Sequence, residues 1–273
     1  MSRQPLFRPP ETSRPSAEPC VRPLADLHET NEQYTAHHLT LPPHTSVALG
    51  GGSQLGGYVA AGEVDVFAAD QGPVRLGTAG FFQVSHAASV EVSNATDAPA
   101  TVITFVSPGT IDLPHKTQLR CVGPTQGDCI AAVGDLYRFL ATAQTSDGAF
   151  AIWEARVFPG GGPPPHVHTR EEEGFFLLSG ELQFTIDGQS TTAAAGSFAN
   201  MPPGVEHAFY NSTDTVAMML IAVAPGGMEQ MFARTGVRLT SPDDRVLPPT
   251  PAEKQRLLQI APEYGITIQP PSH

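Results

Sequence analysis

The chain has 273 residues, and its 27 Asp and Glu outnumber its 15 Lys and Arg, which gives a formal net charge of -12. This length allows two domains of ordinary size, and the negative charge disfavours binding to nucleic acid or to an anionic membrane surface. No apolar segment approaches the length that crosses a bilayer. We therefore expect a cytoplasmic protein that binds neither nucleic acid nor membrane.

Turn-forming residues occur throughout the chain, which contains 26 Gly and 27 Pro. The segments between them are short and rich in Val, Ile, Phe and Thr, as β-strands are. This pattern predicts an all-β protein built from barrels or sandwiches. The first element, residues 1–29, is a Pro-rich arm, whose polar part at 1–20 we expect to wrap around the surface or to be disordered.

An internal repeat organises most of the remaining chain. Residues 94–97 (Asn-Ala-Thr-Asp), an apolar run and Ser-Pro-Gly match residues 211–214 (Asn-Ser-Thr-Asp), an apolar run and Ala-Pro-Gly, at an offset of 117 residues. Such self-similarity predicts two copies of one β module. We place the first copy at 30–112, a linker at 113–131 and the second copy at 132–226.

A C-terminal extension, residues 227–273, follows the second copy. Its residues Thr250 to Glu253 combine an N-cap Thr, Pro at the first helical position and Glu at the third, which together form a capping box. They predict a helix over about 251–263, which we interpret as a structural clasp. Just after the second module, residues 226–232 (Gly-Gly-Met-Glu-Gln-Met-Phe) are expected to form a short helix that closes one mouth of a barrel.

Four residues of the second module have the types and spacing of metal ligands. His166 and His168 are two residues apart, so on a strand both imidazoles lie on the same face. Glu173 follows a polar stretch that suits a turn and begins an apolar strand. His207 begins another strand just after the turn signal Pro-Pro-Gly at 202–204. We therefore expect the four side chains to converge on one metal ion from neighbouring strands.

These residues lie in two blocks that resemble the two signature motifs of the cupin superfamily. The match holds at every motif position and spacing, namely Gly160, His166, His168, Glu173 and Gly180, then Gly196, Pro202, Gly204, His207 and Asn211. The resemblance identifies the chain as a bicupin. It implies two jelly-roll-type β-barrels in tandem with a short C-terminal α-helix, and one divalent metal bound by His166, His168, Glu173 and His207.

The first module lacks these ligands. Applying the repeat offset places Ala48 or Leu49, Gly50 or Gly51, Leu55 or Gly56, and Val90 at the four positions. None of these side chains can coordinate a metal, so we interpret the first module as a degenerate barrel. His44 and His86 could form an irregular site, but single histidines near turns are more often solvated or capping.

Three imidazoles and one carboxylate suit Fe, Mn, Ni, Co, Cu or Zn. Coordination positions left open are typical of catalytic rather than structural sites. Glu173 could also act as the catalytic base toward a substrate hydroxyl. Phe175, Phe209, Trp153 and Met218 are candidates for lining the pocket, and no Arg or Lys occurs from Gly174 to Phe209. Such surroundings favour an apolar or aromatic substrate.

Within the cupins, the arrangement is similar to the quercetin 2,3-dioxygenase-like group. The similarity rests on the length, the His-Val-His that follows a Pro run, and the Pro-Gly-Gly followed by Met and Phe. It implies a metal-dependent dioxygenase that acts with O2 on a flavonol or related enol, and a homodimer. Two alternatives stay open, because one fold hosts many activities. They are a metal-dependent decarboxylase or isomerase of a small acid, and a non-catalytic metal-binding or ligand-binding cupin.

Overall fold

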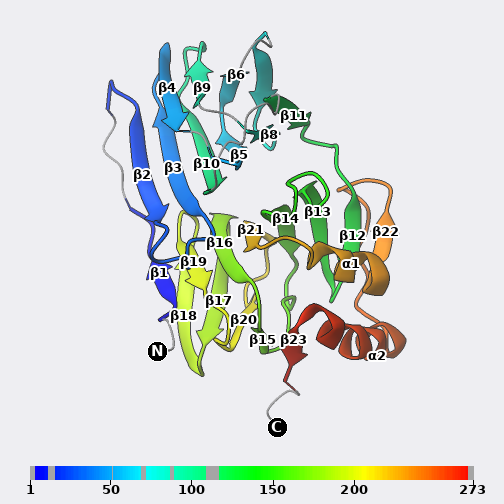
Figure 1. Ribbon diagram of the computed structural model, residues 1–273. Coiled ribbons are helices and arrows are strands. Elements are labelled where there is room, and N and C mark those ends of the chain that lie inside the picture. The colour runs from blue at the N-terminus through cyan, green and yellow to red at the C-terminus, as the bar shows by residue number, and fades with distance from the viewer. Residues whose placement is uncertain are drawn as a thin grey trace. The chain divides into compact units, whose positions relative to one another are not determined.

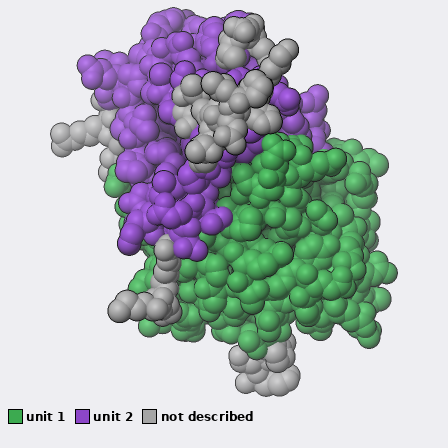
Figure 2. All heavy atoms as spheres, in the orientation of Figure 1, with its two compact units in different colours: residues 1–11, 128–273 green, residues 12–127 purple. Residues whose placement is uncertain are grey.

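The structure is a computed structural model that describes residues 4–11, 16–50, 52–68, 72–86, 89–108 and 117–269. The chain divides into two compact units, one of residues 1–11 with 128–273 and one of residues 12–127 (Figure 2). Each unit consists of two antiparallel sheets, which confirms the predicted all-β class with two tandem barrels. Among the described residues, no helix is long and apolar enough to cross a membrane.

The unit of residues 12–127 has a six-stranded sheet in the order β11-β8-β5-β10-β3-β2 and a four-stranded sheet in the order β4-β9-β6-β7 (Figure 1). Its core consists of Leu, Val, Ala and Phe side chains from both sheets. The strands are β2 Cys20–Ala25, β3 Thr35–Leu41, β4 Thr45–Gly50, β5 Gln54–Ala61, β6 Glu63–Phe67, β7 Val74–Gly77, β8 Phe81–Ser85, β9 Ser89–Asn94, β10 Ala100–Ser107 and β11 Gln118–Val122.

The other unit has an eight-stranded sheet in the order β1-β19-β16-β21-β14-β13-β12-β22 and a five-stranded sheet in the order β18-β17-β20-β15-β23. Its strands are β1 Leu6–Arg8, β12 Cys129–Ala132, β13 Asp135–Ala141, β14 Ala151–Val157, β15 His166–His168, β16 Glu172–Ser179, β17 Glu181–Ile186, β18 Gln189–Ala194, β19 Phe198–Met201, β20 His207–Tyr210, β21 Ala217–Ala224, β22 Val237–Leu239 and β23 Ile266–Ile268. Two helices, α1 Glu229–Thr235 and α2 Pro251–Ile260, follow the barrel strands.

The N-terminal arm and the linker contain more regular structure than the sequence suggested. β1 pairs with β19 of the C-terminal barrel, and β2 pairs with β3 of the N-terminal barrel. Both strands lie at the ends of their sheets, where Pro23 of β2 does not interrupt a central ladder. The linker likewise contains β11 and the beginning of β12. Pro-rich composition indicated disorder here because it does not show which sheet edges are available for pairing.

The capping box before α2 is formed as predicted. The N–H of Thr250 donates to Glu253 Oε2 over 2.6 Å, and the N–H of Glu253 donates to Thr250 Oγ1 over 3.2 Å. The α-helix ends at Ile260 rather than near residue 263, and a 3-10 helix continues over Ala261–Tyr264. Pro262 lacks the N–H that a longer α-helix would need there.

The repeated Asn-x-Thr-Asp motif closes the same turn in both barrels. The Nδ2 of Asn211 donates to the carbonyls of Val157 and Thr215, each over 2.8 Å, and its Oδ1 accepts from the N–H of Thr213. In the N-terminal barrel, Asn94 makes the corresponding contacts with Leu41, Ala98 and Thr96. Both amides are buried. This part of the repeat therefore has a structural role.

Asn211→Ala is expected to lower the free energy of unfolding by about 2–4 kcal/mol, because it leaves several buried backbone groups without partners. The neighbouring substitution Ser212→Ala, at an exposed side chain, is the matched control and should change it by less than about 0.5 kcal/mol. Urea unfolding of the full chain measures both values. Equal stability of the two variants would contradict the structural role of Asn211.

Candidate metal centre

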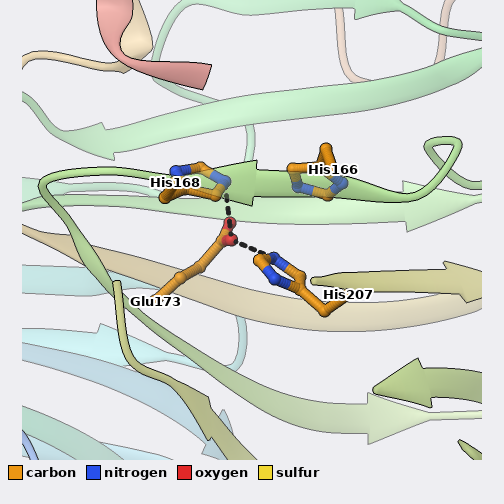
Figure 3. A group of neighbouring side chains, drawn as sticks. All are labelled: His166, His168, Glu173 and His207. Atoms are coloured by element: carbon orange, nitrogen blue, oxygen red, sulfur yellow. Dashed lines mark hydrogen bonds and ion pairs between the residues drawn. The ribbon is translucent and has the colours of Figure 1, made fainter. Parts of the chain in front are cut away.

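The four predicted ligands lie together inside the C-terminal barrel (Figure 3). His166 and His168 come from β15, and His166 pairs in register with His207 at the start of β20. Glu173 reaches them from β16 in the other sheet. One potential ligand atom from each residue lies within 4.8 Å of all the others. Among the described residues, no other group of three or more His, Cys, Asp and Glu side chains is arranged in this way.

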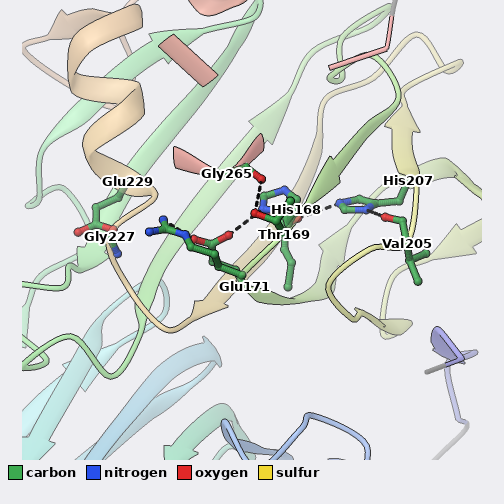
Figure 4. Close-up of polar contacts among 10 residues, drawn as sticks. His168, Thr169, Glu171, Val205, His207, Gly227, Glu229 and Gly265 are labelled. Atoms are coloured by element: carbon green, nitrogen blue, oxygen red, sulfur yellow. Dashed lines mark hydrogen bonds and ion pairs between the residues drawn. The ribbon is translucent and has the colours of Figure 1, made fainter. Parts of the chain in front are cut away.

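The Nδ1 atom of each histidine faces an oxygen outside the cluster. For His166 this is the carbonyl of Pro164 and for His207 the carbonyl of Val205, each at 3.0 Å. A carbonyl only accepts, so Nδ1 carries a proton in both rings, and Nε2 is the atom through which each ring would bind a metal. For His168 the Nδ1 faces the Glu171 carboxylate at 3.5 Å (Figure 4). Such outer partners orient metal-binding histidines.

The Nε2 atoms converge on the Glu173 carboxylate. Its Oε2 lies 2.9 Å from His207 Nε2 and 3.2 Å from His168 Nε2. All of these groups are buried, and a buried carboxylate is costly unless it is paired or coordinates a metal. Three imidazole nitrogens and one carboxylate oxygen around one point are a donor set that divalent transition metals accept. The residues therefore fit a metal ion.

Electrostatics within the metal-free cluster favour one bound proton. Burial alone would raise the pKa of Glu173, but the neighbouring His168 and His207 hold it well below its usual range. Burial alone would lower the pKa of His168, but the Glu173 and Glu171 carboxylates outweigh it and raise that pKa to about 9. Glu171 and Glu172 are themselves buried, although they belong to the polar stretch before Glu173, whose composition suits an exposed turn.

We expect the affinity for Zn²⁺ to rise roughly tenfold per pH unit between pH 6.5 and 8.5, because the ion must displace the His168 proton below its pKa of about 9. Chelator competition at three pH values measures this slope. In Glu171→Gln one of the carboxylates that raise the pKa is neutral, so the affinity should level off at a lower pH. An affinity that does not change over this range would contradict the expectation.

A small apolar cavity of about 60 Å³ opens beside the cluster. Of the predicted pocket residues, Trp153 and Phe209 line it and the other two do not. Phe175 packs against His207, with ring centroids 6.0 Å apart, and lines a separate hollow. Met218 is absent from the barrel core, which contains its neighbour Met219, because successive strand residues point to opposite faces.

The C-terminal extension supplies much of the cavity wall that sequence reasoning missed. Met228, Met231 and Phe232, from α1 and the residue before it, line the cavity, as do Leu257 of α2 and the two isoleucines of β23. β23 pairs directly with β15, and Thr169 donates to the Gly265 carbonyl from both its N–H and its hydroxyl. Of this extension, only residues 226–232, with their Met and Phe, were expected from the sequence to close one mouth of the barrel.

The cavity wall offers polar groups that donate hydrogen bonds. Burial, followed by the Asp135 and Glu173 carboxylates, raises the pKa of Tyr137, so its hydroxyl stays protonated. The indole Nε1 of Trp153 is buried and has no hydrogen-bond partner among the described residues. Among the described residues that line the cavity there is no Arg or Lys.

The N-terminal barrel has apolar side chains at the corresponding positions. Leu49 pairs with Val90 across neighbouring strands, as His166 pairs with His207 in the other barrel. Leu55 occupies the strand position that corresponds to Glu173. These three side chains are buried in that barrel's core. Gly51, which corresponds to His168, lies outside the described residues. His44 binds the exposed Asp97 over 3.0 Å, and neither His44 nor His86 belongs to a metal-type cluster among the described residues.

Comparison with known proteins places a cupin domain in the second barrel, because residues 153–224 match the cupin domain family model. The chain is 26% identical over 111 residues, 41% of its length, to quercetin 2,3-dioxygenase of Bacillus subtilis. It is 36% identical over 68 residues, 25% of its length, to a β-D-galactosidase of Mycobacterium tuberculosis. The matched stretches span 33% and 59% of these two proteins.

Solved structures share the fold of most of the chain. They include AerE from Microcystis aeruginosa, with a TM-score of 0.62 and 16% identity over 80% of this chain and 98% of that chain. Oxalate decarboxylase of Lactobacillus farciminis matches with a TM-score of 0.60 and 12% identity, over 78% of this chain and 83% of that chain. Procruciferin, an 11S globulin of Brassica napus, matches with a TM-score of 0.60 and 8% identity, over 82% of this chain and 84% of that chain. At these identities the likeness concerns the fold alone.

Proposed function

We propose that this chain, a two-barrel member of the cupin superfamily, is a metal-dependent dioxygenase that acts on an apolar enol such as a flavonol. The observation that carries the proposal is the cluster of three histidines and Glu173, which opens on an apolar cavity with no Arg or Lys among its described lining residues. The similarity to quercetin 2,3-dioxygenase over 111 residues supports it.

Four protein ligands leave room for substrate on an ion that prefers six. A bound divalent metal would act as a Lewis acid toward the enol oxygen. Glu173 lines the cavity and would accept the enol proton, while Tyr137, which also lines it, would donate a hydrogen bond to a substrate carbonyl. The apolar wall excludes bulk water from the ionised substrate. Both atoms of O2 would enter the product, so the reaction needs no separate reductant.

The cavity lining disfavours decarboxylation of a small diacid. Such a substrate brings a second carboxylate, whose burial requires a cation or several hydrogen-bond donors. The lining residues include no Arg or Lys, and their apolar surface predominates. Binding without catalysis has no specific support from the site, because the cavity adjoins the cluster where a substrate would need to be.

Metal analysis and oxygen uptake test the proposal together. Protein purified without chelators should contain one transition metal per chain and should consume O2 with flavonols or smaller enols. His207→Ala should lose both the metal and the activity, because it removes one of four ligands. His44→Ala and His86→Ala are the matched controls and should keep both. Protein that contains no metal and takes none up on reconstitution would overturn the proposal.

A further inference from the structure

The cavity at the metal cluster is too small for the substrate class proposed above. It measures about 60 Å³, whereas a cavity known to bind one benzene molecule measures roughly 150 Å³. The enol group of a substrate fits beside Glu173, but the rings that carry it extend beyond this space. An apolar substrate of more than one ring therefore needs additional space next to this cavity.

A second and larger cavity adjoins it within the same unit. It measures about 220 Å³ and lies among the turn between β12 and β13, α2, and residues 245–250. Val133 and Leu257 line both cavities, so these two side chains lie at the boundary between them. The outer cavity is mostly apolar, and Arg245, Lys254 and Glu253 also line it. The Glu253 carboxylate already accepts hydrogen bonds from the N–H and the hydroxyl of Thr250.

Val133 has an unusual backbone at this boundary. Its φ is 56°, in the left-handed region that β-branched residues rarely adopt, and Gly134 follows with φ 90°. These two residues form the loop of the β12–β13 hairpin, a turn that requires positive φ at both positions, and Val is a strained choice there. The turn thus holds a bulky side chain in a strained position at the point where the two cavities meet.

We propose that the outer cavity is the entrance to the metal centre and the subsite for the distal part of its substrate, with Val133 and Leu257 as the gate. The occupant has an enol and carbonyl head at the metal cluster and an apolar ring body that passes between the gate residues. Its distal end is hydroxylated or anionic, because it meets Arg245 and Lys254. This inference rests on the proposed function only for the identity of the occupant.

Acrylamide quenching tests the gate without any substrate. Trp153 is the single tryptophan of the chain, is fully buried and lines the inner cavity, so its fluorescence reports access to that cavity. Leu257→Ala should raise the Stern–Volmer constant at least twofold, and Leu257→Phe should lower it. Leu258→Phe is the matched control and should leave it unchanged, because Leu258 is 55% exposed and lines neither cavity.

Two probes with the same head test the subsite. 3-Hydroxy-4-pyranone has the enol and ketone alone, whereas 3-hydroxyflavone adds a fused ring and a phenyl group. In the metal-loaded full chain without O2, calorimetry should show that Leu257→Phe weakens 3-hydroxyflavone binding at least tenfold more than it weakens 3-hydroxy-4-pyranone binding. Leu258→Phe should affect neither probe.

The outcomes separate this inference from the proposed function. If Leu257→Phe discriminates between the probes but no O2 is consumed, the subsite stands and the dioxygenase proposal fails. If O2 is consumed but Leu257→Phe alters both probes equally or neither, the subsite is overturned. If neither probe binds, the acrylamide quenching experiment decides. Equal Stern–Volmer constants for Leu257→Ala, Leu257→Phe and the original chain would then overturn the gate.

Discussion

The constraint on which the C-terminal barrel depends is the buried carboxylate of Glu173. An ionised carboxylate inside a barrel is stable only when positive or hydrogen-bonding groups surround it. Here His168 and His207 do so at 3.2 Å and 2.9 Å, and carbonyls or a carboxylate outside the cluster fix the orientation of the rings. The strands and the turns before them bring the four side chains together. The partners outside the cluster set the direction in which each ring points.

The N-terminal barrel shows that the fold does not require such a cluster. At the corresponding positions it buries Leu49, Leu55 and Val90, which pack without any charge to compensate. Replacing buried ionic groups by apolar side chains of similar volume is often neutral or stabilising. The C-terminal barrel therefore keeps a costly arrangement that the same architecture can do without, which favours a chemical role over a structural one.

The clustering of the four candidate ligands could be predicted from sequence because local rules determine their positions. Strand alternation places His166 beside His168, and the Pro-Gly turn fixes where the strand of His207 begins. The internal repeat likewise predicted two copies of one β module, and the structure has two units of two sheets each. The burial of Glu171 and Glu172 could not be predicted, since a run of polar residues before a strand has the composition of an exposed turn.

Most of the cavity wall also escaped prediction, because it depends on segments distant in sequence. Nothing in Ile266 to Ile268 indicates pairing with the strand of His166 and His168, which lies about 100 residues earlier. Met218 and Met219 could not be told apart, because an uninterrupted apolar strand gives no phase for its alternation. Nothing in the sequence marks Tyr137 as a functional residue, because its place beside Glu173 results only from the way in which the barrel folds.

The C-terminal extension connects these observations. Its strand β23 pairs with the strand of two ligands, its α1 brings Phe232 within 5.7 Å of Trp153 between ring centroids, and its α2 brings Leu257 to the boundary of the two cavities. Arg234 and Glu263 form an ion pair that joins α1 to the 3-10 helix after α2. The barrel strands thus hold the candidate ligands, and the extension forms much of the wall of the cavity beside them. Under the proposed function, the identity of the ligands fixes the type of reaction, whereas the size of the substrate depends on a segment that is not part of the barrel.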